Sequence, residues 1–256
     1  MMKDLFDEFG RCLPGNDVGP AHSKTRRYFQ CTQPEINLQS IYKRALSILG
    51  PADDISFDEF QQRINTALDS LNKGDTINMT KGAFIPFLLP VNSGLDDLGT
   101  AMHQHYLPAL KSAFHEELPE SEFTIEVPNL SERLSLREGT NHCELMDRIR
   151  KESIAGIVFP CMTEYSIPAA LQQINLLPEQ CITSGAVDIT AALIAAPTLL
   201  LRNEGYPPTL WLTAIQGESE NIGYHYEAYG YNLKLYRRAH LGKASEYWWQ
   251  SVTVLA

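Results

Sequence analysis

Three side chains near the C-terminus could act together in acid–base chemistry or in ligand binding: His225, Glu227 and Lys234. An imidazole takes up or releases a proton near neutral pH, and a neighbouring carboxylate or ammonium group can orient it or hold a charged ligand. The spacing of apolar and polar residues predicts a β-hairpin from residues 223–228 and 231–237 that turns near Tyr229 and Gly230.

A loop of two or four residues fixes the expected cross-strand pairs of this hairpin. The pairs are Glu227 with Asn232, Tyr226 with Leu233, His225 with Lys234, and Tyr224 with Leu235. The apolar members share one face, as in a sheet that covers a core, and the polar members share the other. The polar face could bind a ligand or perform acid–base work. A solvated outer face with one cross-strand charge pair explains the same residues and is the commoner case.

A second group of candidate binding residues follows the hairpin. No acidic residue lies between Tyr231 and Lys243, and this stretch contains Arg237, Arg238 and His240. Cations beside aromatic rings suit an anion or an acidic partner. The sequence predicts that a small anionic ligand or a protein partner binds through Lys234, Arg237, Arg238 and Trp248. A charged turn that only aids solubility is the alternative.

Cys161 is the candidate nucleophile, because it follows a predicted buried strand at residues 156–159 and precedes a predicted helix at 168–174. A thiol that faces a helix N-terminus has a lowered pKa and reacts more readily. A hydrolase or transferase would need Cys161 or Ser166 within about 10 Å of His225, Glu227 or Arg237, in an enclosed pocket. A buried structural cysteine is the alternative, since free Cys is among the most buried residue types.

The motifs predict neither a metal site nor a cofactor. His103 and His105 lie two residues apart on a predicted helix, where their side chains point in different directions. The stretch 53–60 resembles half of a calcium loop, but the preceding positions lack side-chain oxygens, and a capping box of Ser56 and Glu59 explains it. The chain also lacks a Walker A loop and the Gly-x-Gly-x-x-Gly, His-Glu-x-x-His and Gly-x-Ser-x-Gly motifs.

The composition narrows the class of protein. The 256 residues include 31 acidic and 21 basic side chains, for a net charge of −10. Such a chain is not expected to bind nucleic acids in general, because that requires an excess of Lys and Arg. Five widely spaced cysteines without a Cys-x-x-Cys motif predict reduced thiols and a cytoplasmic location. The longest apolar stretch, residues 189–201, is too short to span a bilayer, so no membrane association is expected.

Aromatic residues are concentrated at the C-terminal end. Residues 206–256 hold seven of the eleven tyrosines and all three tryptophans. Tyr and Trp serve both cores and binding faces. The leading hypothesis is a binding or interaction protein that uses this aromatic and basic sheet region, which requires an exposed aromatic patch. The alternative is a hydrolase- or transferase-type enzyme with a site between the Cys161 turn and the face that carries His225 and Glu227.

The order of helix and strand signals predicts an α+β fold. An N-terminal helical segment, residues 1–80, packs on a mixed sheet in residues 81–256 that ends in an antiparallel meander, and the two parts could form one compact domain. Pro108 should kink or break one of the helices of the second part. We expect strands at 84–91, 123–127 and 156–159, a loop at 128–143, and helices near 34–49, 56–74, 95–114, 168–174, 187–196 and 197–202.

Residues 160–224 resemble the C-terminal part of an uncharacterised bacterial domain family. The resemblance rests on the order of Ala169-Ala170, Ile182-Thr183, Ala191-Ala192-Leu193, Pro197-Thr198-Leu199-Leu200, Pro208-x-Leu210-Trp211-Leu212 and Ile222-Gly223-Tyr224. The chain departs from the family pattern by its long aromatic tail and by the lack of a Gly-Ser-Arg-type segment. The family has no established activity, so the resemblance implies a bacterial protein but no function.

Overall fold

A mixed eight-stranded sheet forms the centre of the computed structural model, which describes residues 5–19, 31–202 and 207–256. The strand order is β1–β4–β10–β6–β8–β9–β2, and β5 pairs with β10 beside this path. The strands are β1 (Ile85–Leu89), β2 (Phe123–Ile125), β4 (Ile154–Thr163), β5 (Ile182–Thr183), β6 (Thr209–Trp211), β8 (Gly223–Tyr229), β9 (Asn232–Arg238) and β10 (Trp248–Leu255). Strand β3 (Ser135–Leu136) lies within the predicted loop at 128–143. It pairs with β7 (Ile215–Gln216) in a separate two-stranded sheet.

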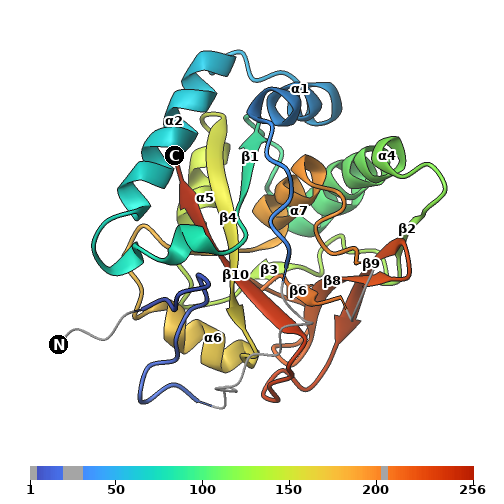
Figure 1. The fold of residues 1–256 in the computed structure, drawn as a ribbon. Coiled ribbons are helices and arrows are strands. Elements are labelled where there is room, and N and C mark those ends of the chain that lie inside the picture. Colours follow the sequence, from blue (N-terminus) through green and yellow to red (C-terminus); the bar gives the residue numbers. More distant parts are fainter. Residues whose placement is uncertain (1–4, 20–30, 203–206) are drawn as a thin grey trace.

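Helices cover both faces of this sheet (Figure 1). Helices α4 and α7 pack over one face, where the larger apolar core also holds Tyr224, Tyr226 and Trp249. Helices α2 and α6 pack over the other face. The helices are α1 (Leu38–Leu49), α2 (Phe57–Leu71), α3 (Leu98–Ala101), α4 (Leu107–Glu117), α5 (Cys143–Ile149), α6 (Ile167–Ile174) and α7 (Ala186–Ala195), with short turns η2 (Gly74–Thr76) and η3 (Met79–Lys81) and a π-helical segment η4 (Met102–Tyr106).

The arrangement confirms the expected α+β fold, with an N-terminal helical segment on a mixed sheet whose last strands are mostly antiparallel. Helix α2 starts as predicted, because the side chain of Ser56 accepts a hydrogen bond from the Glu59 amide. The Glu59 carboxylate pairs with Arg63 at 2.6 Å. Across the described ranges, no helix combines the length and the apolar character needed to cross a bilayer.

The hairpin β8–β9 forms with the predicted faces but in a different register. Tyr226 pairs with Leu235 and Glu227 with Lys234, so every predicted pair is displaced by two residues. The loop holds only Gly230 and Tyr231, and Gly230 has φ 61°, which suits the first loop position of a type II′ turn. A shift of two residues leaves each side chain on its own face, because the side-chain repeat of a strand is also two.

One helix prediction was wrong, and a second was wrong only in part. Residues 197–202 do not continue as a helix after α7, because Ala196 precedes Pro197 and has the non-helical angles φ −134° and ψ 77°. Pro108 does not break its helix either. The π-helical segment η4 leads directly into α4, with Pro108 in the first turn.

Candidate functional site

The His225–Glu227 pair lies on the face of β8 turned away from the larger core. The His225 Nε2 atom lies 3.1 Å from Oε2 of Glu227, and the imidazole is fully buried. The Trp211 ring packs against the imidazole, with 4.6 Å between ring centroids. Burial lowers the pKa of His225, although the hydrogen bond with Glu227 opposes this effect. The same hydrogen bond is the main cause of the lowered pKa of Glu227.

At neutral pH this pair therefore holds a neutral imidazole that donates through Nε2 to an ionised carboxylate. The Nδ1 atom of His225 and the Nε1 atoms of Trp211 and Trp248 find no hydrogen-bond partner within the described residues. The rings of Trp211 and Trp248 lie 4.4 Å apart and form a small apolar cluster with Ile167 and Leu241. His225 is thus embedded in packed aromatic rings and does not present its base to solvent, whereas the Glu227 side chain is 27% exposed.

The burial of His225 predicts that stability depends on pH. Because the pKa of His225 is lowered by folding, the unfolded chain takes up this proton first as the pH falls below the ordinary value of 6.5. Its contribution to stability is complete above that pH and is lost below it. When the pH is lowered from 7.5 to 5.5, the free energy of unfolding measured in urea should fall by up to about 1 kcal/mol more for the wild type than for His225→Asn. Equal losses in the two proteins would contradict the lowered pKa.

Cys161 does not face a helix N-terminus. It lies within β4, is 4% exposed, and has a pKa well above the ordinary thiol value because of its burial. Three strand-to-strand steps (β4, β10, β6, β8) separate it from His225, or about 14 Å between backbones. Ser166 is also fully buried, and its hydroxyl caps α6 by accepting from the Ala169 amide. The structure therefore does not unite Cys161 with the His225–Glu227 pair.

This position predicts how the cysteines react with iodoacetamide. Cys143 is exposed, whereas Cys12, Cys161 and Cys181 are buried, with raised thiol pKa values. In the folded protein, peptide mass spectrometry should find Cys143 alkylated first and the three buried thiols only after denaturation. Alkylation of Cys161 as fast as that of Cys143 would restore it as a candidate nucleophile. The Cys143→Ser variant controls for opening of the fold caused by the first adduct.

The basic residues that were predicted to bind a ligand already interact with other residues of the protein. Lys234 forms an ion pair of 2.6 Å with Glu126, and Arg238 donates to the hydroxyl of Tyr247 at 2.7 Å. Arg237 interacts with Tyr224: burial raises the pKa of Tyr224, and the charge of Arg237 and its hydrogen bond oppose this effect. Trp248 is 3% exposed. A ligand at this patch would have to displace internal contacts, and Trp248 offers it almost no surface.

The aromatic tail divides into core residues and a few exposed tyrosines. Tyr229 and Tyr231 flank Gly230 at the tip of the hairpin and are 74% and 62% exposed, and Tyr236 is 37% exposed. Tyr247 is half-buried, and the other described Tyr and Trp residues of this region are buried: Trp211, Tyr224, Tyr226, Trp248 and Trp249. Tyr206 lies outside the described residues. Aromatic surface for a ligand is therefore offered at the tip of the hairpin and at Tyr236 of β9, while the other hairpin rings, Tyr224 and Tyr226, are buried.

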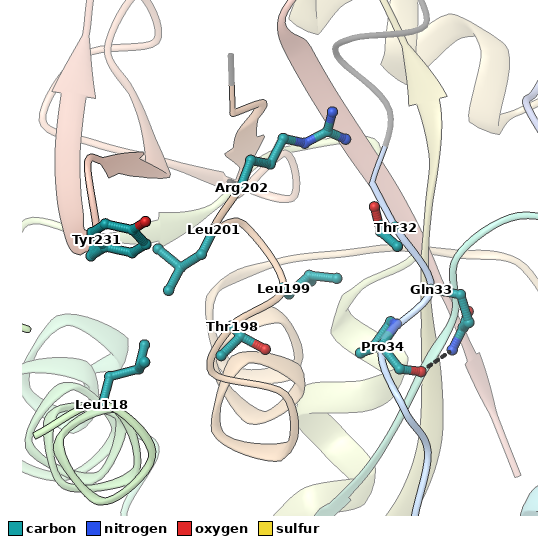
Figure 2. A pocket seen from close by; sticks show the side chains of 9 residues that line it. All are labelled: Thr32, Gln33, Pro34, Leu118, Thr198, Leu199, Leu201, Arg202 and Tyr231. Atoms are coloured by element: carbon teal, nitrogen blue, oxygen red, sulfur yellow. Dashed lines mark hydrogen bonds between the residues drawn. The ribbon is translucent and has the colours of Figure 1, made fainter. Parts of the chain in front are cut away.

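A pocket of about 680 Å³ lies beside this hairpin tip (Figure 2). One wall comes from residues 32–34, ahead of α1, and another from the segment after α7, which contributes Leu199, Leu201 and Arg202. Leu118, at the end of α4, and Tyr231 complete the lining near Leu201. The volume falls within the range of about 300–1,000 Å³ that is usual for small-molecule sites.

Hydrogen bonds fix the walls of the pocket. The Gln33 amide pairs with the backbone of Phe84 at 2.8 and 3.1 Å and so fastens the extended segment to the chain that enters β1. Arg44 of α1 forms an ion pair of 2.6 Å with Glu117 and donates to the carbonyl groups at the end of α7. The helix ends beneath the pocket are thus held together without a ligand.

Arg202 supplies the only formal charge among the described lining residues. Burial lowers its pKa, but a guanidinium remains protonated at neutral pH. The nearby thiol of Cys31 does not neutralise it, because burial raises the pKa of Cys31 to about 12. The pocket thus combines one cation with the side chains of Leu118, Leu199 and Leu201, and this combination suits a ligand with an anionic group and an apolar body.

Comparison of the chain with protein-family models, with curated proteins and with solved structures finds no match. Within the described ranges, no cluster of three or more His, Cys, Asp or Glu side chains could hold a metal ion.

The sequence predictions missed Arg202 and the pocket around it. One feature of the sequence could have indicated the site: Arg202 directly follows the longest apolar stretch, where we expected an ordinary helix end. The other walls come from residues 32–34, Leu118 and Tyr231, which lie in separate segments of the chain that local patterns do not connect.

Proposed function

We propose that this protein binds a small organic anion, most simply a monocarboxylate with an apolar or aromatic body, in the pocket between Arg202 and Tyr231. The observation that carries the proposal is one guanidinium in a pocket lined by leucine side chains. Arginine matches the planar geometry of a carboxylate with two parallel hydrogen bonds. The partly exposed ring of Tyr231 supports an aromatic body, since rings prefer offset or edge contacts.

The proposal places at this pocket the anion binding that we expected at the basic residues of the hairpin. The sequence predicted that a small anion binds at Lys234, Arg237, Arg238 and Trp248. The proposal keeps this class of ligand but assigns its binding to Arg202. Five free cysteines and an acidic charge further support a reducing, cytoplasmic setting without nucleic-acid partners. Both remain parts of the proposal.

A matched set of ligands tests the proposal by isothermal titration calorimetry. 4-Phenylbutyrate, 4-phenylbutanol and 4-phenylbutylamine share one body and differ in the charge of the head group. The carboxylate should bind at least about tenfold more tightly than the alcohol, because a hydrogen bond to a charged group contributes about 1.5–3 kcal/mol. The amine should not bind. Equal affinities for all three, or binding of none, would contradict the proposal.

A further inference from the structure

A second pocket adjoins the π-helical segment η4. The Leu107 amide donates to the carbonyl oxygen of Met102, five residues back, in place of the usual four. This widened turn places Gln104, His105 and Tyr106 along one wall of a pocket of about 380 Å³. Single π-turns within α-helices are rare and occur frequently at functional sites. The loop that leaves β1, residues 90–94, forms the opposite wall.

Hydrogen bonds hold the loop wall in place. The Asn92 amide donates to the Ile149 carbonyl at 2.8 Å, and the Asn92 side chain accepts from the Gly94 amide at 2.9 Å. The Val91 amide donates to the Ser153 hydroxyl, which in turn donates to Asp54. The wall is therefore formed in advance of any ligand, which reduces the ordering cost of binding.

The polar groups of this pocket are uncharged. Its described lining includes no Asp, Glu, Lys or Arg. Burial lowers the pKa of His105, so its ring is neutral at pH 7 and offers one donor and one acceptor. The Tyr106 hydroxyl accepts from Asn92 at 3.4 Å, and no acceptor for its own proton is found within the described residues. The Gln104 amide, which is exposed, adds both donors and an acceptor.

We infer that this pocket is a second binding site, for a neutral polyhydroxylated molecule of monosaccharide size. Tyr106 is 1% exposed and offers a ligand almost no surface. The exposed Gln104 amide and the neutral His105 ring supply donors and acceptors for hydroxyl groups, each of which both donates and accepts. The absence of formal charge among the described lining residues disfavours acidic and amino sugars, whose charge would lose water without gaining a partner. The site shares no residue with the pocket at Arg202, so either proposal can fail alone.

Saturation-transfer NMR with a panel of neutral aldopentoses and aldohexoses tests this site. At least one sugar should show saturation transfer at millimolar concentration, and its matched uronic acid and amino sugar should show less. Gln104→Ala alters an exposed side chain, leaves the fold intact and should weaken binding about fivefold. Tyr236→Phe is the matched control outside the pocket and should bind as the wild type does.

The inference is overturned if no neutral sugar in the panel shows transfer, if the charged sugars bind as well as the neutral ones, or if Gln104→Ala binds like Tyr236→Phe.

Discussion

Replacement of Trp211 by alanine is expected to lower the free energy of unfolding by about 3–5 kcal/mol. Trp211 is 1% exposed and lies between the rings of Trp248 and His225, at 4.4 and 4.6 Å between centroids. The substitution leaves a large cavity in a cluster that has few ways to collapse. Urea denaturation monitored by circular dichroism measures the loss. Tyr229→Ala, at the exposed hairpin tip, should change the same free energy by less than about 1 kcal/mol.

This pair of variants decides whether the aromatic tail is core or binding face. If Trp211→Ala unfolded at nearly the wild-type urea concentration, the burial of the tail would be contradicted. The original expectation of an aromatic binding face would then regain its basis. A large loss at Trp211 with little change at Tyr229 assigns the length of the hairpin to the core and leaves its tip for recognition.

Replacement of Arg202 by glutamine should abolish the preference for the carboxylate ligand. Arg202 supplies the only formal charge among the described residues of its pocket, so its removal should weaken binding of 4-phenylbutyrate about tenfold to a hundredfold. Binding of 4-phenylbutanol should hardly change, because its apolar contacts remain. Arg202→Lys should lie between the two, since an ammonium group keeps the charge but loses the bidentate geometry. Calorimetric titration of each variant with both ligands gives the comparison.

The matched control for this substitution is Arg133→Gln. Arg133 forms an exposed ion pair of 2.7 Å with Glu218 and does not line the pocket. Its variant should bind both ligands as the wild type does. An equal loss of carboxylate binding in Arg133→Gln would mean that general positive charge, and not the pocket, attracts the ligand.

The predictable part of this fold follows local periodicity. Alternation along residues 223–237 correctly assigned Tyr224, Tyr226, Leu233 and Leu235 to the core face, even though the register was wrong by two residues. The error arose at the loop, because either of the two loop lengths considered preserves the faces. Gly230 alone, with its positive φ, determines which loop forms.

The predictions that failed concern features that depend on tertiary structure or on a single neighbouring residue. Residues 197–202 carry a helical apolar pattern, but Ala196 precedes a proline and leaves the helical region. Trp248 and Trp249 are neighbours in β10, so their side chains point to opposite faces of the sheet, and they belong to different apolar clusters. Both are nevertheless buried, because helices cover both faces of the sheet. Alternation within a strand does not reveal whether its second face is covered.

The candidate site was predictable only in its chemistry. An anion-binding cation near the aromatic tail was expected, but Lys234 and Arg238 are engaged by Glu126 and Tyr247. Arg202, Tyr231 and residues 32–34 come to line one pocket only after the chain has folded. No sequence pattern links these segments, since each is an ordinary loop or helix end by itself.

Methyl NMR during titration with 4-phenylbutyrate tests the location of the site most directly. If the ligand occupies the pocket at Arg202, the methyl signals of Leu118, Leu199 and Leu201, which line it, should shift in a saturable manner. The methyl signals of Leu241, which packs against Trp211 and Trp248, should stay in place. Saturable shifts at Leu241 with none at the three pocket leucines would contradict this account and return the site to the aromatic cluster.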